Sequence, residues 1–184
     1  MRPEDYTVLG VDPGGEHTGL AVLGYDFHHG FTLHACLTLN TADPAMVRLA
    51  VADLTSGMWR VMPGGIVVTV ERFVVRGRAA RSSAADAGER ARDLIGRVSG
   101  LAEERGYPLH TRSAAECKKW ATDKRLSVAG LLEGSKGEGG HRRDAVRHAL
   151  MTGVLSYGWP DPLSKTYRSR HTGDDHHGEV PPQH

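Results

Sequence analysis

Two apolar runs in this chain each end on a carboxylate. The first run is followed by Asp12 and the second by Glu71. A carboxylate at the end of a buried strand loses its hydration, so it needs a cation or hydrogen-bond donors nearby. A third acid, Asp144, lies far downstream in a helical stretch that begins at His141. We therefore expect a fold that brings two strand ends and a late helix together, where oxygen ligands can bind a divalent cation.

The order of the predicted elements indicates an α/β fold. Alternating or continuous apolar patterns bounded by turn residues predict strands over residues 6–12, 18–25, 31–39, 66–71 and 108–112. Helical spacing of apolar residues predicts helices over residues 44–61, 82–105, 113–120, 123–133 and 141–155. Three closely spaced strands followed by α/β crossovers predict a mixed five-stranded sheet with helices on both faces.

The length and composition suit one soluble domain followed by a tail. The chain has 184 residues, of which 39% are hydrophobic and 24% are charged, values that are ordinary for a globular protein. We expect residues 1–156 to form the domain. Residues 157–184 are rich in His and Pro, and we expect them to form a tail that buries too little apolar area to become ordered.

Compartment and membrane association are also constrained by the sequence. No apolar stretch approaches the roughly 18 residues that a membrane span needs, and the acidic N-terminus does not resemble a signal peptide. The two cysteines, Cys36 and Cys117, are isolated in the sequence. We therefore expect no membrane association and a reducing, cytoplasmic location, with both thiols in packing roles.

Charge is distributed unevenly along the chain. Residues 1–71 contain 3 Lys/Arg against 8 Asp/Glu, whereas residues 72–147 contain 17 against 10. A basic middle region of this kind can neutralise phosphates and release counterions, as nucleic-acid-binding proteins do. The alternative is that many of these arginines only solvate helix faces.

The three acids point to metal-assisted chemistry. Asp12, Glu71 and Asp144 suit Mg²⁺, with Mn²⁺ able to substitute, and two such ions can activate a water and stabilise the leaving oxygen of a phosphodiester. His141 lies three residues before Asp144 on one helical face, so it is a candidate ligand or base. The alternative for His141 is a solvent-exposed residue at a helix start. His148, four residues after Asp144, is interpreted as structural or as support for the site.

These segments together resemble a known family. Residues 8–22, the segment that begins Val70-Glu71-Arg72-Phe73, and the helix containing His141 and Asp144 resemble the RuvC family of Holliday junction resolvases, in particular its phage and actinobacterial members. The resemblance extends from about residue 6 to residue 155. It implies an RNase H-like nuclease domain with a divalent-metal site that cleaves branched DNA as a homodimer. It also implies the cytoplasm of a bacterium or of a phage-infected host.

The resemblance carries over to individual residues. Asp12, Glu71 and Asp144 match the family's acids, and His141 matches a position where members have Asp or His. Phe73 is the nearest match to an aromatic residue used at the junction, although its offset is one residue short, and Lys118 and Lys124 match basic residues near the scissile backbone. The full set of expected DNA-contacting residues is Arg72, Phe73, Arg76, Arg78, Arg81, Lys118, Lys119, Lys124 and Arg125.

Three other functions are compatible with parts of the pattern. A sugar-kinase or actin-like phosphotransferase would need a duplicated domain and a much longer chain, so we expect no nucleotide cofactor. A YqgF-like nuclease would share the fold and act on structured RNA. A non-catalytic protein that binds branched DNA would keep the fold without the chemistry. Our interpretation is a metal-dependent endonuclease that cleaves Holliday junctions, forks or flaps.

Overall fold

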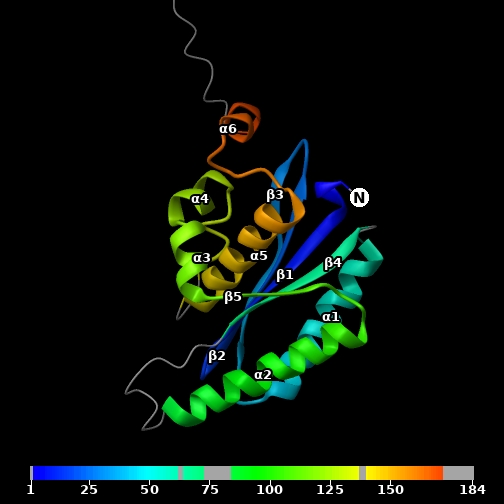
Figure 1. Cartoon of the computed structure of the whole chain (residues 1–184), viewed down its shortest axis with the longest axis vertical. Helices are drawn as coiled ribbons and strands as arrows, with labels where there is room; N and C mark the ends of the chain where they lie inside the picture. The colour runs from blue at the N-terminus through cyan, green and yellow to red at the C-terminus, as the bar shows by residue number, and fades with distance from the viewer. Residues whose placement is uncertain (1, 62–63, 73–83, 137–139, 172–184) are drawn as a thin grey trace, which may run out of the picture.

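A five-stranded mixed sheet forms the centre of the molecule (Figure 1). The computed structural model describes residues 2–61, 64–72, 84–136 and 140–171. A 3₁₀ turn at Pro3–Asp5 precedes the sheet. The strands are β1 (Tyr6–Pro13), β2 (His17–Asp26), β3 (Gly30–Asn40), β4 (Gly65–Glu71) and β5 (Leu109–Arg112), in the spatial order β3-β2-β1-β4-β5. The first three strands pair antiparallel, and β1, β4 and β5 run parallel, which confirms the predicted fold class.

Helices cover both faces of this sheet (Figure 1). The helices are α1 (Pro44–Val61), α2 (Ala84–Glu104), α3 (Ala114–Trp120), α4 (Asp123–Val128), α5 (His141–Tyr157) and α6 (Lys165–His171). The Asp43 side chain accepts hydrogen bonds from two backbone N–H groups of the first turn of α1, as an N-cap residue does. Helix α4 ends five residues earlier than the sequence predicts, because Gly130 adopts a positive φ of 72° that ends the helical path.

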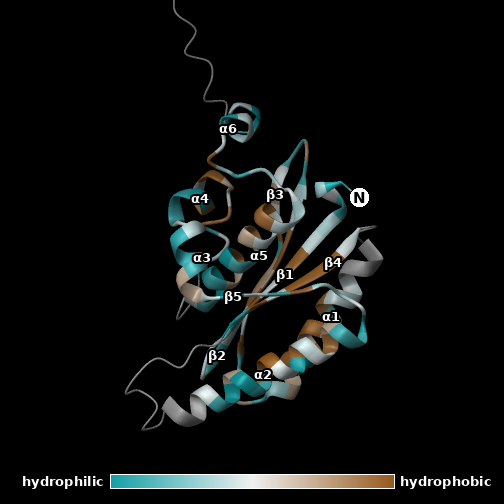
Figure 2. Ribbon diagram, in the orientation of Figure 1, coloured by the Kyte–Doolittle hydropathy of each residue, from teal (hydrophilic) through white to brown (hydrophobic). Residues whose placement is uncertain are grey.

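The sheet separates two apolar cores, and alternate residues of β1 face each of them. Val8 packs with Val146 and Leu150 of α5, whereas Leu9 packs with Val51 of α1 and Leu94 of α2. The hydropathy colouring shows this burial as apolar strands between helices that turn their polar faces outward (Figure 2). No helix among the described residues combines the length and the apolar character that a bilayer crossing requires.

The segment after Tyr157 differs from the predicted unstructured tail as far as residue 171. The Trp159 side chain is only 2% exposed, donates a hydrogen bond from Nε1 to the Pro3 carbonyl at 2.8 Å, and packs with Tyr25 and Phe31. Tyr167 of α6 is buried against Phe31. Two large aromatic side chains bury enough area to order this segment despite its prolines. Residues 172–184 lie outside the described part of the chain.

Candidate metal centre

Asp12 and Glu71 lie side by side at one edge of the sheet. Strands β1 and β4 are parallel neighbours in which Val11 pairs with Val70, so the two acids occupy the next position on each strand. The carboxyl ends of adjacent parallel strands meet at the same edge, which is where α/β proteins commonly place ligands. Asp12 is 5% exposed, and the Glu71 carboxylate is partly buried. The expectation that the two strand-end acids share one location is consistent with this geometry.

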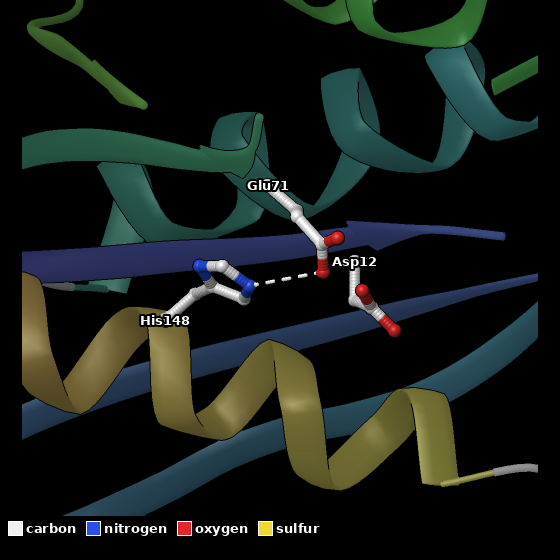
Figure 3. Close-up of side chains that lie close together, drawn as sticks. All are labelled: Asp12, Glu71 and His148. Atoms are coloured by element: carbon white, nitrogen blue, oxygen red, sulfur yellow. Dashed lines mark hydrogen bonds and ion pairs between the residues drawn. The ribbon is translucent and has the colours of Figure 1, made fainter. Parts of the chain in front are cut away.

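His148 of α5 completes a compact group with these two acids (Figure 3). Its Nε2 lies 3.3 Å from Glu71 Oε2, and its Nδ1 lies 3.1 Å from the Cys117 sulfur. One ligand atom from each of Asp12, Glu71 and His148 lies within 4.8 Å of the other two, the one such group of three among the described residues. The signal in the sequence was the spacing of His148 on the same helical face as Asp144.

His141 contacts the group from the first turn of α5. Its Nδ1 lies 2.7 Å from Asp12 Oδ2, and its ring is partly buried. The ring also lies against Gly14 in the loop after β1, where a Cβ atom would come within 2.5 Å of His141 Cε1. Gly14 therefore leaves the space in which His141 approaches Asp12, and the solvent-exposed alternative for His141 does not describe this structure.

Asp144 lies beside the group but is paired with cations of the protein itself. Its Oδ2 is 2.8 Å from Lys118 Nζ, and its Oδ1 accepts a hydrogen bond from Arg147, which also pairs with Asp123. Asp144 is therefore not one of the three residues that already converge within ligand distance. Lys118 occupies the place of a counterion to this acid, and a metal that binds Asp144 Oδ2 must displace it.

The buried carboxylates have opposite pKa shifts. Burial raises the pKa of Asp12 to about 6, and the neighbouring Glu71 contributes, although the hydrogen bond from His141 opposes the rise. Burial also acts to raise the pKa of Glu71, but the opposing effects, of which the hydrogen bonds from His148 and Asp12 are the largest, outweigh it, so that pKa is lowered. A proton taken up by this pair therefore resides on Asp12.

The basic partners respond in the direction that these acids require. A hydrogen bond to Asp12 raises the pKa of His141 despite partial burial of the ring. A hydrogen bond to Asp144 raises the pKa of Lys118, and the charge of Asp12 adds to the effect. The raised pKa values of Asp12, His141 and Lys118 all indicate excess negative charge at this group of acids. A divalent cation would neutralise that charge. The carboxylate oxygens of this group suit Mg²⁺ or Mn²⁺.

The predicted DNA-contacting residues fall into three sets. Lys118, Lys119, Lys124 and Arg72 are exposed. Arg125 is instead engaged within the protein, as described below. Phe73, Arg76, Arg78 and Arg81 lie outside the described residues.

Arg125 makes contacts that leave little of its guanidinium for a partner. Its Nε and Nη2 donate to both oxygens of Asp161 at 3.1 and 3.2 Å, and its Nη1 donates to the Trp120 carbonyl at 2.7 Å. Its Cζ lies over the Trp120 ring, 4.6 Å from the ring centroid. Burial acts to raise the pKa of Asp161, but the hydrogen bonds from Arg125 and from the Leu163 backbone outweigh it and lower that pKa. These contacts join α4 to the segment before α6.

We expect Arg125→Ala to lower the free energy of unfolding by about 1–2 kcal/mol, because Asp161 loses a two-point partner at a partly buried position. Lys119→Ala is the matched control, because Lys119 is exposed and lies on α3, the helix that precedes α4 in the chain. It should leave stability unchanged. Urea unfolding of both variants measures the difference. A parent-like free energy of unfolding for Arg125→Ala would contradict the structural assignment.

Mixed strand order, helices on both faces and acids at the carboxyl ends of the parallel strands define an RNase H-like fold. Two structures of Thermus thermophilus RuvC share it. One, described as a complex with Holliday junction substrate, has a TM-score of 0.57 and 24% identity, and the other has a TM-score of 0.60 and 20% identity. Each alignment covers 85% of this chain and 99% of RuvC.

The yeast mitochondrial Holliday junction resolvase Ydc2 also has this fold. Its structure aligns with a TM-score of 0.51 and 18% identity, over 82% of this chain and 78% of Ydc2. No family model matches the sequence, and no curated protein matches it. At these identities the similarity establishes the fold, and the chemistry has to be argued from the residues of this chain.

Proposed function

We propose that this chain is a divalent-metal-dependent endonuclease that cuts branched DNA. The observation that carries the proposal is the convergence of buried Asp12 with Glu71 and His148, beside His141 and Asp144, on a fold shared with RuvC. The structural relatives described above are a RuvC in complex with a Holliday junction and a Holliday junction resolvase. Four-way junctions are therefore the first substrate to test, followed by flaps and forks.

In this proposal Asp12, Glu71 and Asp144 hold Mg²⁺, with Mn²⁺ able to replace it, and His141 is an additional ligand or the base for the attacking water. A divalent metal held by these residues would supply Lewis-acid chemistry, lowering the pKa of the attacking water and stabilising the charge on the leaving oxygen of the phosphodiester, and two such ions could share these roles. His141, through its hydrogen bond to Asp12, keeps this acid oriented toward Glu71. The protein supplies no nucleophile of its own.

In this proposal exposed lysines of α3 and α4 supply contacts to the DNA backbone. Lys118, Lys119 and Lys124 are exposed on or next to α3 and α4, and Arg72 directly follows Glu71. Contacts from such residues to phosphates position a substrate by its shape and carry little sequence information. Because Lys118 pairs with Asp144, a phosphate that attracts Lys118 would release this acid for metal binding. We also propose a homodimer in the cytoplasm, as the family resemblance implies.

One panel of substrates tests the function. The full chain is incubated with labelled four-way, flap, fork and duplex DNA and with a structured RNA, in Mg²⁺, in Mn²⁺ and in EDTA. We expect nicks in branched DNA with either metal and none in EDTA. Binding of branched DNA without nicking would favour the non-catalytic alternative. Cleavage confined to the RNA would favour a YqgF-like activity.

Metal affinity should depend on pH through Asp12. Because burial raises the pKa of this acid to about 6, protons compete with the cation below that value, and the carboxylate is free to bind above it. We expect the Mn²⁺ dissociation constant to fall by up to about tenfold per pH unit between roughly pH 5 and 6, and to fall less steeply above roughly pH 7. Electron paramagnetic resonance of free Mn²⁺ measures this. Constant affinity across the range would contradict a role for Asp12 as a ligand.

A further inference from the structure

A buried line of polar groups leads from α3 to the metal-binding edge of the sheet. Cys117 of α3 is 1% exposed, and His148 of α5 is 0% exposed. The Cys117 sulfur lies 3.1 Å from His148 Nδ1, and His148 Nε2 lies 3.3 Å from Glu71 Oε2. The nuclease proposal uses Glu71 at the end of this line and leaves the thiol without a role.

The order of the protons along this line follows from the chemistry of each group. Burial raises the pKa of the Cys117 thiol to about 12, so the sulfur retains its hydrogen and can donate it. A ring nitrogen that accepts a hydrogen bond carries no proton, so the hydrogen of the imidazole is then on Nε2. From Nε2 it points at Glu71 Oε2, which as a carboxylate can only accept.

The other proton arrangements are less favourable. With the hydrogen on Nδ1 alone, the lone pair of Nε2 would face the carboxylate oxygen of Glu71 at 3.3 Å, and two acceptors would oppose each other. With hydrogens on both nitrogens, a fully buried imidazolium would have only a thiol sulfur, a weak acceptor, on its Nδ1 side. The Nε2–H form satisfies both neighbours of the ring.

We propose that Cys117 is a positioning residue, whose thiol fixes His148 as an Nε2–H donor to Glu71. His148 then lies behind Glu71 as the hydrogen-bond donor that orients it, and it does not bind the metal directly. Metal-binding carboxylates are commonly oriented by such outer hydrogen bonds. The inference rests on the proposed function only in taking Glu71 as a metal ligand, because the hydrogen-bond line consists of protein groups alone.

Nitrogen-15 NMR of the histidine-labelled full chain tests the proton arrangement without any metal. We expect His148 to have a protonated Nε2 and an unprotonated Nδ1, and we expect Cys117→Ala to weaken this preference, because only Glu71 then favours it. A proton on Nδ1 in the parent protein would overturn the proposal. Addition of Mg²⁺ should leave the Nε2 proton in place. Its loss on Mg²⁺ addition would show that His148 is itself a ligand, and would also overturn it.

Variants at Cys117 test the effect on the metal. Cys117→Ala removes the donor, and Cys117→Ser restores one in a side chain of similar size. We expect Cys117→Ala to raise the Mn²⁺ dissociation constant by about tenfold or more, in the range seen for outer hydrogen-bonding partners, and Cys117→Ser to recover most of this loss. Thermal unfolding of both variants measures the packing cost separately. Equal Mn²⁺ affinity of the alanine and serine variants would overturn the positioning role.

The same measurements separate this inference from the nuclease proposal. If the parent protein bound no Mn²⁺, the nuclease proposal would fail, and the metal-free NMR spectrum would still decide the His148 tautomer. If the parent bound Mn²⁺ and cut branched DNA with a proton on His148 Nδ1, the nuclease proposal would stand and the role of Cys117 would be rejected.

Discussion

Asp12→Asn should reduce metal-dependent nicking by at least about a thousandfold, while DNA binding is retained. A neutral amide cannot replace a carboxylate as a hard anionic ligand, and the loss of several kcal/mol of transition-state stabilisation corresponds to a rate effect of this size. Binding to branched DNA should persist, because the exposed lysines of α3 and α4 are unchanged and one negative charge has been removed. Nicking and gel-shift assays on one four-way junction measure both properties.

The same substitution should make the metal-free protein more stable. The folded-state pKa of Asp12 is raised from 3.8 to about 6. The contribution of Asp12 to the free energy of unfolding is therefore most favourable below the unfolded-state pKa, and it is lost as the pH rises through about 6. Ionised Asp12 at neutral pH therefore costs stability, by up to about 3 kcal/mol for a shift of roughly two pKa units. Asparagine never ionises, so the substitution removes this cost. The gain is reduced by the loss of the charged contact between residue 12 and His141.

Asp53→Asn is the matched control, because Asp53 is exposed on α1 and lies outside the acidic group. It should leave the nicking rate unchanged, and it should change the free energy of unfolding by no more than about 0.5 kcal/mol. A strongly destabilised Asp12→Asn variant would show that Asp12 is a structural residue, and a variant that still nicks would remove it from the metal site.

The strand-end acids could be predicted from the sequence because two general rules apply to them. Apolar runs that end at Asp12 and Glu71 mark buried strands, and a helical crossover such as α1 commonly returns the chain to lie parallel beside a strand already in the sheet. The sequence also indicated the helix that contains His141 and Asp144. These features depend on local patterns and on chain connectivity, which a sequence displays directly.

The partners of these acids could not be predicted in the same way. Cys117 lies on a different helix from His148, so their contact depends on how α3 packs against α5, and the isolated thiol was interpreted only as a packing residue. The pairing of Asp144 with Lys118 likewise depends on packing between these helices. Trp159 was missed for a related reason, since the surrounding prolines suggested an unpacked tail and the indole finds its partners in distant strands.

Gly10→Ala should have the second large effect, because α5 packs directly on β1 at this residue. A Cβ atom on Gly10 would lie 2.1 Å from the carbonyl oxygen of Ala145, a backbone atom next to Asp144. The clash cannot be relieved by rotating a side chain, so the helix itself must move. We expect a loss of at least about 3 kcal/mol in the free energy of unfolding.

The functional cost should be equally clear, since α5 is the helix that brings His141, Asp144 and His148 to the two strand-end acids. Displacement of catalytic groups by about 1 Å can cost about a hundredfold in rate, so we expect nicking to fall by at least this factor at a temperature where Gly10→Ala remains folded. Gly96→Ala on α2 is the matched control, because nothing lies within 4 Å of the Cβ position at residue 96. The higher helix propensity of alanine should stabilise this variant by about 0.5–1 kcal/mol. Parent-like stability and nicking in Gly10→Ala would mean that α5 does not sit against β1 as described, and the acids would then have no fixed partner on this helix.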